Sequence, residues 1–377
     1  MAIDDTRPTG SHDETSLMKP ARLIAIYLPQ FHPVPENNEW WGLGFTEWTN
    51  VTKARPMFPG HYQPHLPADM GFYDLRVPET REDQANLARA HGIEAFCYYH
   101  YWFGAGRRIL ERPLNEVVAS GKPDFPFCVC WANQTWTGIW HGAPNRILIE
   151  QTYPGDTDHR AHFESLLPAF ADRRHITIDG KPVFSIYKPE DLPDPKRTLD
   201  LWRTMAQEAG LPGLHILGMQ SDMRWNPKDY GFDGKICLPL IQNRPWVSKR
   251  QPIKWLKRQA ALRVGLPSFH SAKRFVPELE ALRSLSYEWH PCLVDTWDNT
   301  PRSGKNGVVL VDASPEQFSQ LVDTALDLVS HREPEHRLVF LKSWNEWGEG
   351  NHLEPDRRNG RKYLEVLRDA MNRSVPT

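Results

Sequence analysis

The chain has 377 residues, of which 40% are hydrophobic and 24% charged, and its formal net charge is -2 at pH 7. This length and composition are typical of an ordinary globular protein with one large domain. The nearly balanced charge excludes a global attraction to nucleic acid or to a membrane, so any such attraction must be local. We therefore expect no nucleic-acid partner.

The cysteines and the first twenty residues indicate where the protein works. The cysteines are Cys97, Cys128, Cys130, Cys237 and Cys292. Their odd number and irregular spacing argue against a secreted disulfide scaffold, and no second ligand pair completes a zinc pattern. Residues 1–20 are polar, without the apolar core of a signal peptide, and no run of roughly 18 apolar residues suggests a membrane span. We expect a disordered tail over residues 1–20, a single domain over residues 21–377 and a cytoplasmic location.

Eight short apolar runs recur along the chain, with helical patterns between them. The expected strands are Leu23–Leu28, Ala95–Tyr99, Phe127–Trp131, Val183–Tyr187, His215–Met219, Gly234–Leu238, Cys292–Thr296 and Val339–Trp344. The clearest expected helices are Pro78–His91, Asp158–Arg173, Pro195–Ala209 and Pro315–Ser330. Such runs fit strands buried on both faces, and eight strand–helix units predict an α/β fold, the closed (β/α)8 or TIM barrel. A Rossmann sheet is disfavoured because no Gly-rich turn follows the first strand.

Long loops are expected after strands 1 and 6. They run from Pro29 to about Val77 and from Pro239 to about His290. Both leave the carboxyl ends of their strands, where barrel enzymes keep their active sites. The aromatic run of residues 40–48 in the first loop could fold over a cleft as a lid.

The strongest chemical signal is the segment SWNEWGEG at residues 343–350. Its carboxylates, Glu346 and Glu349, lie three residues apart and would face the same side in a turn, which Gly348 and Gly350 permit. Glycosidic chemistry needs such a pair, because one carboxyl protonates the leaving oxygen and the other stabilises or attacks the positive centre. The alternative is a salt-bridged pair in a surface loop.

Aromatic and polar residues cluster after other strands, at residues 98–102, 131–136 and 295–300. Aromatic rings can stack on sugar rings, and Asn and Gln can pair with sugar hydroxyls. The alternative is that these side chains cap or fill the core, and His65 is more often structural than catalytic. The candidate substrate-binding residues are Tyr27, Gln30, His32, Trp48, Tyr99, His100, Trp102, Trp131, Asn133, Trp136, Tyr187, Trp297, Asp298, Asn345 and Trp347.

A basic segment lies in the second long loop. Residues 244–274 contain nine Lys or Arg and no Asp or Glu. Lys254, Lys257 and Arg258 would share one face of a short amphipathic helix. This helix could rest on an anionic membrane or hold an anionic substrate such as a lipid diphosphate, or it could simply be solvated.

Several long motifs resemble those of the WbsX-type proteins, which are glycoside hydrolase family 99-like proteins found in bacterial O-antigen and polysaccharide gene clusters. These motifs are AIYLPQFHP (25–33), WWGLGFTEWTNV (40–51), CYYHYWF (97–103), WANQTW (131–136) and WNEWGEGNHLEPD (344–356). The resemblance extends from about Arg22 to Leu367. It implies a (β/α)8 barrel that needs neither a metal nor a nucleotide cofactor.

The resemblance also implies roles for the two glutamates. Family 99 enzymes are retaining endo-α-mannosidases with an Asn-Glu-Trp-His-Glu-Gly motif, matched here by residues 345–350. Glu346 would then take the proton from the sugar 2-hydroxyl, whose oxygen closes on the anomeric carbon as a 1,2-anhydro sugar. Glu349 would act as acid and then as base. Gly348 replaces the motif's His, which puts mannose specificity in doubt.

Three functional readings remain open at this point. The first is a retaining glycosidase or transglycosylase acting on a polysaccharide. The second is a glycosyltransferase of lipopolysaccharide, O-antigen or capsule assembly that uses a lipid-linked or nucleotide sugar. The third is a non-catalytic glycan-binding module, against which the intact pair of glutamates argues.

Overall fold

Eight parallel strands close into a barrel, as predicted. The computed structural model describes residues 20–138, 143–239 and 252–373. The barrel strands are β1 (Arg22–Tyr27), β2 (Ile93–His100), β3 (Phe127–Trp131), β7 (Lys181–Ile186), β8 (His215–Gln220), β9 (Gly234–Cys237), β11 (Trp289–Val294) and β13 (Leu338–Lys342). They follow the order β3-β2-β1-β13-β11-β9-β8-β7, and pairing of β3 with β7 closes the cylinder. The (β/α)8 prediction is therefore confirmed, with every predicted strand overlapping an observed one.

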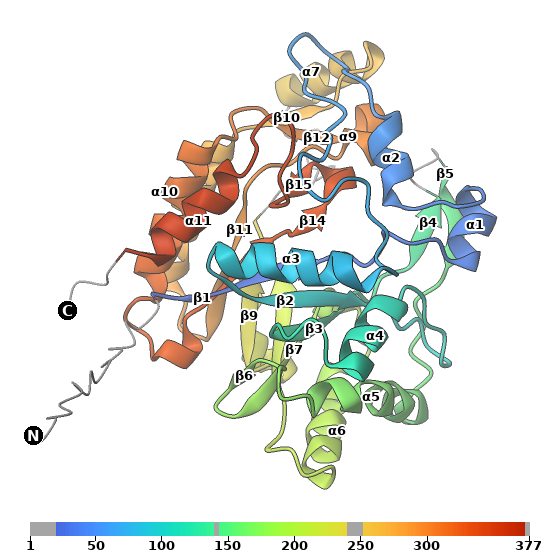
Figure 1. The fold of residues 1–377 in the computed structure, drawn as a ribbon, viewed down its shortest axis with the longest axis vertical. Helices are drawn as coiled ribbons and strands as arrows, with labels where there is room; N and C mark the ends of the chain where they lie inside the picture. The colour runs from blue at the N-terminus through green and yellow to red at the C-terminus, as the bar shows by residue number, and fades with distance from the viewer. Residues whose placement is uncertain (1–19, 139–142, 240–251, 374–377) are drawn as a thin grey trace, which may run out of the picture.

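Helices surround this barrel (Figure 1). They are α3 (Pro78–Ala90), α4 (Arg112–Ser120), α5 (Asp156–Phe170), α6 (Pro195–Glu208), α8 (Phe275–Glu280), α10 (Pro315–Val329) and α11 (Lys362–Met371). The four helices expected from the sequence are α3, α5, α6 and α10. The expectation of a helix after every strand is wrong in one place, because the 3-10 helix η3 (Pro227–Tyr230) joins β8 to β9. That connection is too short for a full helix.

The loops at the carboxyl ends of the strands carry their own short elements. After β1 come α1 (Pro35–Trp41) and α2 (Glu47–Lys53), and after β3 comes the hairpin of β4 (Trp136–Gly138) and β5 (Ala143–Ile149). The loop after β9 contains α7 (Pro252–Arg263), β10 (Ser268–His270), η4 (Ala272–Arg274) and η5 (Ala281–Ser284). After β11 come α9 (Thr300–Ser303), η6 (Gly304–Asn306) and β12 (Val308–Leu310). After β13 come β14 (Asn345–Glu346), η8 (Trp347–Glu349) and β15 (Asn351–His352).

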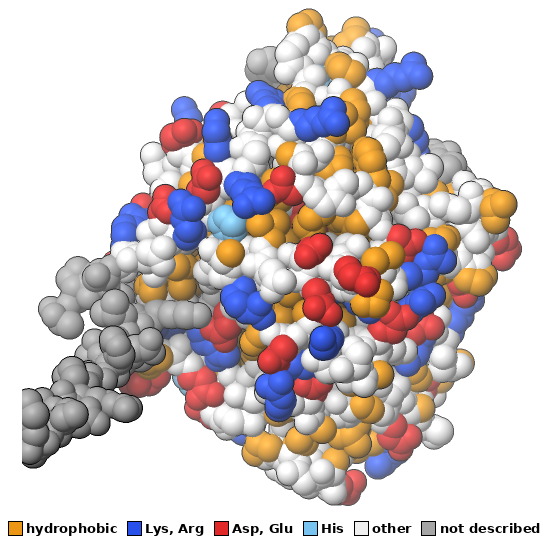
Figure 2. All heavy atoms as spheres, viewed as in Figure 1, with side chains coloured by type: hydrophobic (Ala, Val, Ile, Leu, Met, Phe, Trp, Pro, Cys, Tyr) orange, Lys and Arg blue, Asp and Glu red, His pale blue; other side chains and the backbone are white. Residues whose placement is uncertain are grey.

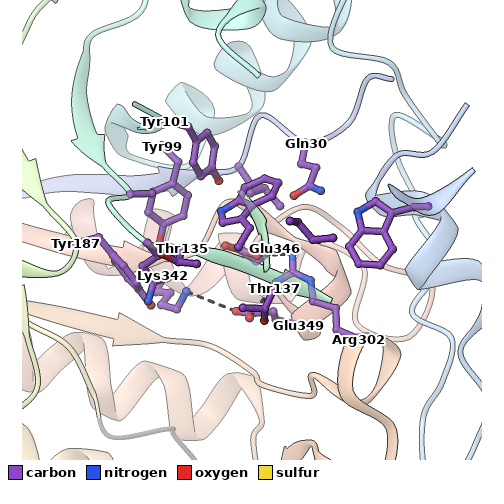
Figure 3. A pocket seen from close by; sticks show the side chains of 16 residues that line it. Gln30, Tyr99, Tyr101, Thr135, Thr137, Tyr187, Arg302, Lys342, Glu346 and Glu349 are labelled. Atoms are coloured by element: carbon purple, nitrogen blue, oxygen red, sulfur yellow. Dashed lines mark hydrogen bonds and ion pairs between the residues drawn. The ribbon is translucent and has the colours of Figure 1, made fainter. Parts of the chain in front are cut away.

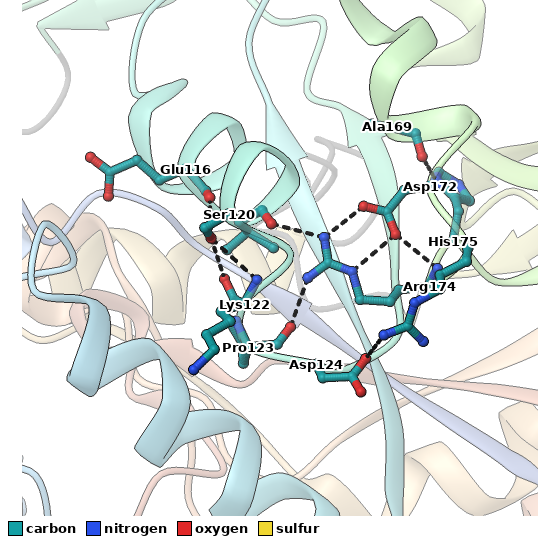
Figure 4. Close-up of polar contacts among 11 residues, drawn as sticks. Glu116, Ser120, Lys122, Pro123, Asp124, Ala169, Asp172, Arg174 and His175 are labelled. Carbon is teal, nitrogen blue, oxygen red and sulfur yellow. Dashed lines mark hydrogen bonds and ion pairs between the residues drawn. The ribbon is translucent and has the colours of Figure 1, made fainter.

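The remaining elements lie near the amino-terminal ends of the strands or between strands and helices. These are β6 (Thr177–Ile178), η2 (Pro189–Asp191) and η7 (Pro334–His336). Arg174 holds the loop after α5 against the loop before β3. It donates to the carbonyl oxygens of Val117 and Pro123 and pairs with Asp172 (Figure 4). Because this guanidinium is buried, its three partners offset its desolvation.

The core and the surface agree with the composition. All five cysteines are buried and none forms a disulfide. On the face drawn in Figure 2, acidic and basic side chains are interspersed, as the small net charge predicts. None of the helices in the described ranges combines the length and apolar composition that a membrane crossing needs.

Two sequence predictions fall partly outside the described residues. The expected tail lies there except for Pro20, and so does the part of the basic segment over residues 244–251. Helix α7 forms where a short helix is expected, but the side chains of Lys254, Lys257 and Arg258 lie outside the described ones. Their predicted role stays a prediction.

Candidate active site

A pocket of about 250 Å³ opens at the carboxyl ends of the barrel strands (Figure 3). Its side chains come from the ends of β1, β2, β7 and β13, from the β4–β5 hairpin and from the loop after β11. The lining residues are Leu28, Gln30, Trp41, Tyr99, Tyr101, Ala132, Gln134, Thr135, Trp136, Thr137, Leu148, Tyr187, Arg302, Lys342, Glu346 and Glu349.

Glu346 and Glu349 reach this pocket because the chain turns sharply after β13. Glu346 ends β14 and Glu349 ends the one-turn helix η8, so the two side chains lie on the same side of a turn. Gly350 follows with φ +55°. An added Cβ at Gly350 would lie 2.9 Å from the carbonyl oxygen of Asp298, so the close approach of the two loops requires glycine.

One guanidinium bridges the two glutamates. Nη2 of Arg302 lies 2.9 Å from Oε2 of Glu346, and its Nη1 lies 2.9 Å from Oε1 of Glu349. Nζ of Lys342 lies 3.6 Å from Oε2 of Glu349 (Figure 3). The candidate pair is therefore held in a network of charges and is not a salt bridge on an open surface.

Glu47 is the third carboxylate partner of Arg302 and lies outside the pocket lining. Its Oε1 accepts a hydrogen bond of 2.8 Å from Nε of Arg302, and its side chain is fully buried. A Cβ added at Gly348 would overlap this same oxygen and would lie 2.9 Å from Nε of Arg302. Glu47 thus occupies the space that any side chain at position 348 would need.

We expect Gly348→Ala to be strongly destabilising, because the new methyl group must push Glu47 away from Arg302. Breaking a buried ion pair costs on the order of 3 kcal/mol. Urea unfolding of Gly348→Ala, Glu47→Ala and the double variant measures the coupling. Adding Gly348→Ala to Glu47→Ala should cost much less than adding it to the wild type, and equal costs would contradict the steric argument.

Burial and charge set the protonation of the site. Burial raises the pKa of Glu346 above its ordinary value, as does the neighbouring charge of Glu349, while Arg302 and Lys342 lower it. Burial lowers the pKa of Arg302, but its three carboxylate partners raise this pKa by more than burial lowers it. The guanidinium therefore stays charged. Burial also raises the pKa of Tyr99, Tyr101 and Tyr187, which leaves three neutral phenols facing the pocket.

The pH profile of activity should report the charge of Arg302. The guanidinium lowers the pKa of Glu346, so Arg302→Gln should raise that pKa, and a base at this position would lose its proton only at higher pH. We expect the acidic limb of kcat/KM to move upward by about 1–3 pH units, the usual effect of one close opposite charge. Arg302→Lys, which keeps the charge, should move the limb less. An unmoved limb in Arg302→Gln would mean that another group controls it.

Six of the sequence-predicted residues meet in this pocket. They are Gln30, Tyr99, Trp136, Tyr187, Glu346 and Glu349. The sequence reasoning missed Arg302, Lys342, Glu47 and Tyr101. Glu47 and Tyr101 lie inside aromatic motifs that were recognised, and Lys342 interrupts the apolar run predicted as the last barrel strand. Nothing in the local sequence around Arg302 distinguishes it from an ordinary surface cation.

Three other predicted residues turn to the helix layer instead. Successive side chains of a strand point to opposite faces, so Tyr99 and Tyr101 face the pocket while His100 and Trp102 face outward. His100 lies 2.9 Å from His162 of α5 (Nε2 to Nε2), and the Trp102 ring stacks on the His162 ring at 4.7 Å. Trp131 packs edge-on against the same imidazole at 4.6 Å. These three residues lie outside the pocket lining.

Another group of predicted residues lies outside the pocket lining, and several of them form hydrogen bonds with neighbouring elements. Asn345 joins β14 to the end of β1, because its amide accepts from the Leu28 N–H at 2.7 Å and donates to the Leu28 carbonyl at 3.0 Å. Tyr27 donates to Gln84 at 2.7 Å. Asn133 pairs with the Lys188 backbone. The buried residues His32, Trp48 and Trp347 also lie outside the lining.

Trp297, Asp298 and His65 line a neighbouring hollow of about 310 Å³. Asp298 accepts hydrogen bonds from Nε2 of His61 at 2.6 Å and from Gln63 at 2.7 Å, so it fixes the first long loop against the loop after β11. The Trp297 ring centroid lies 5.2 Å from Nζ of Lys342. This ring therefore lies beside the lysine that pairs with Glu349.

Solved structures of similar fold are sugar-acting proteins. The GH99 endo-alpha-mannosidase from Bacteroides thetaiotaomicron aligns with a TM-score of 0.58 at 12% identity, over 93% of this chain and 95% of that one. A glycoside hydrolase-like protein aligns with a TM-score of 0.57 at 15% identity, over 93% and 94% of the two chains. At these identities the likeness supports the barrel fold and nothing finer.

Closer sequence relatives exist in Xanthomonas campestris pv. campestris. The uncharacterized protein WxcX, from two strains, is 36% identical over an alignment of 386 positions that covers 98% of this chain and 54% of the relative. This chain therefore spans about half the length of the curated relatives it matches. A family model described as Glycosyltransferase WbsX matches residues 23–367. Because that match covers most of the chain, the protein belongs to the WbsX glycosyltransferase family, as its motifs predict.

Proposed function

We propose that this protein cleaves or transfers a glycosidic bond of a bacterial polysaccharide or O-antigen, with retention of configuration. One observation carries the proposal: Glu346 and Glu349 reach one aromatic-lined pocket at the carboxyl end of the barrel and share one guanidinium. Family membership and the fold of the neighbours support sugar chemistry in general.

In the first step Glu346 removes the proton from the sugar 2-hydroxyl. The freed 2-oxygen attacks the anomeric carbon and forms a 1,2-anhydro sugar, while Glu349 protonates the departing glycosidic oxygen. The raised pKa of Glu346 favours this role, since a carboxylate with a higher pKa is a stronger base. Arg302 keeps the carboxylate ionised and oriented in the absence of substrate.

In the second step Glu349, now a carboxylate, takes a proton from water or from an acceptor hydroxyl. The oxygen so activated opens the strained ring at the anomeric carbon, and Glu346 returns its proton to the 2-oxygen. Two inversions at one carbon give net retention. Whether water or a sugar hydroxyl attacks decides between hydrolysis and transfer.

The pocket walls suit a sugar that differs from mannose. Trp136 offers an aromatic face, and three tyrosine hydroxyls with Gln30 and Gln134 offer donors and acceptors. At position 348 a side chain of the related mannosidases is replaced by the Glu47–Arg302 pair. Because this ion pair fills the space of that side chain, the pocket favours a substrate with a different pattern of hydroxyl or charged groups.

A glycosyltransferase is the second candidate. The description of the family and the basic segment of residues 244–274 favour it. Helix α7 would then lie against an anionic lipid surface or bind the diphosphate of a lipid-linked sugar. In this case the donor would react only when an acceptor glycan is present.

Mass spectrometry of glycan products distinguishes these readings. The full chain is incubated with cell-derived polysaccharide and, separately, with lipid-linked oligosaccharide, each with and without added acceptor. Shortened glycans indicate hydrolysis, lengthened acceptors indicate transfer, and Glu349→Gln should produce neither. Binding of glycan without any product, or products unchanged in Glu349→Gln, would contradict the proposal.

A further inference from the structure

A second cluster of ligating side chains lies at the opposite end of the barrel from the pocket. It contains His215, the first residue of β8, Glu288 and His290 at the start of β11, and His336 of η7 before β13. All four lie at the amino-terminal ends of neighbouring strands, because β8, β9, β11 and β13 are consecutive in the barrel. The proposed reaction uses none of them.

The donor atoms converge on one carboxylate oxygen. Oε1 of Glu288 lies 3.4 Å from Nε2 of His215, 3.2 Å from Nε2 of His290 and 3.5 Å from Nδ1 of His336. With Zn–N and Zn–O bonds of about 2.0–2.1 Å, neighbouring ligand atoms of a tetrahedral site are about 3.4 Å apart. A direct charge-assisted hydrogen bond would bring such atoms to about 2.8 Å.

Several of these donors lack hydrogen-bond partners although they are buried. Nε2 of His215, both ring nitrogens of His290 and Oε1 of Glu288 have none. The His290 side chain is 0% exposed and that of His215 is 6% exposed. Buried polar atoms without partners are unfavourable, and one cation would satisfy Nε2 of His215, Nε2 of His290 and Oε1 of Glu288 together.

A comparison within the chain strengthens this argument. His65, His352 and Asp356 also lie close together. There Nδ1 of His65 and Nε2 of His352 are 2.9 Å apart, so the two rings already hydrogen-bond to each other. In the His215 cluster the two imidazoles instead face one carboxylate oxygen of Glu288, at the longer distances of 3.4 and 3.2 Å.

We propose that His215, Glu288 and His290 bind a Zn²⁺ ion. Their donor atoms lie within 4.8 Å of one another. Two imidazoles and one carboxylate are a ligand set that suits Zn²⁺. The ion would join the amino-terminal ends of β8 and β11, and water would take its fourth position.

The surroundings fit such a site. His336 lies just outside the ligand group, with Nδ1 3.5 Å from Oε1 of Glu288 and Nε2 3.2 Å from Oδ1 of Asp179, so it can orient the ligating carboxylate. Glu288 and His336 also line a surface hollow, which gives an ion a path to the buried donors. Arg332 in this hollow stacks on Trp289 with its guanidinium carbon 4.1 Å from the ring centroid.

Metal titration of the untagged full chain tests the site. After removal of metal with a chelator, calorimetry with Zn²⁺ should show one equivalent bound, and Co²⁺ should give the intense visible bands of a tetrahedral complex. Saturating Zn²⁺ should raise the Tm by about 4 °C. His290→Gln and Glu288→Gln each remove a ligand and should weaken Zn²⁺ binding by about 100-fold or more, and His336→Ala, which removes a partner of Glu288, by about 10-fold.

His331→Ala is the matched control, since His331 is an exposed histidine of the same connection. It should bind Zn²⁺ as the wild type does. Circular dichroism checks that each variant is folded, and Glu288→Gln, at a partly exposed ligand, keeps the test decisive if His290→Gln does not fold. Absence of stoichiometric binding overturns the proposal. So does binding that survives Glu288→Gln but is lost in His65→Ala, because the ion would then occupy the other cluster.

Discussion

Glu346→Gln is expected to reduce kcat/KM by on the order of 100-fold to 10,000-fold for every substrate, whatever its leaving group. The amide keeps the size of the side chain and cannot accept the 2-hydroxyl proton. An activated aryl glycoside does not help, because the base acts on the sugar and not on the departing group. Steady-state kinetics with an aryl glycoside and with the natural glycan measure the two losses.

The substrate offers an independent check of the same step. A 2-deoxy sugar lacks the nucleophile and should fail with the intact enzyme. Glu365→Gln makes the same substitution on an exposed face of α11 and should leave the kinetics unchanged. If a 2-deoxy-2-fluoro glycoside instead leaves a covalent sugar ester on Glu346, that residue is an ordinary nucleophile and the anhydro-sugar route is wrong.

Glu349→Gln should show the opposite dependence on the leaving group. It removes the proton donor, so the natural glycan, with its poorly leaving sugar alkoxide, should lose on the order of 100-fold or more in kcat/KM. An aryl glycoside with an acidic phenol needs little protonation and should retain most of the first-step rate. A burst of phenol followed by slow turnover would separate the two steps, because the second step lacks its base.

Equal losses on both substrates would contradict an acid role for Glu349. The losses on the two substrates can be compared only if the variant keeps the geometry of the site. We expect it to do so, because Arg302 retains two carboxylate partners, Glu47 and Glu346, in Glu349→Gln. Stability measured by urea unfolding controls for a general collapse of the charge network. A variant that is stable but equally slow on both substrates would show that the residue positions Arg302.

The fold could be predicted from the sequence because burial on both faces leaves a simple signature. Strands such as β1 and β13 are nearly continuous apolar runs, and Pro78 at the start of α3 marks a helix start. The missing helix between β8 and β9 could not be predicted in the same way, since short connections carry no periodic pattern.

The candidate site was predicted less completely, and β2 shows why. Alternation means that only every second residue of its aromatic run can face the pocket, but the sequence does not say which set. Tyr99 and Tyr101 face inward, while His100 faces α5. Arg302 was missed for another reason: its contacts with Glu47 and Glu346 span 255 and 44 residues, and loops after different strands bring them together.

Proton NMR of the anomeric centre tests the central claim most directly. With a substrate identified by the product screen, the configuration of the first-formed product is followed with time in the wild type and in Glu346→Gln. A retaining reaction at Glu346 and Glu349 predicts that the first product keeps the configuration of the substrate and that its signal is lost in the variant. A first product of inverted configuration, or an unchanged rate in Glu346→Gln, would contradict the account.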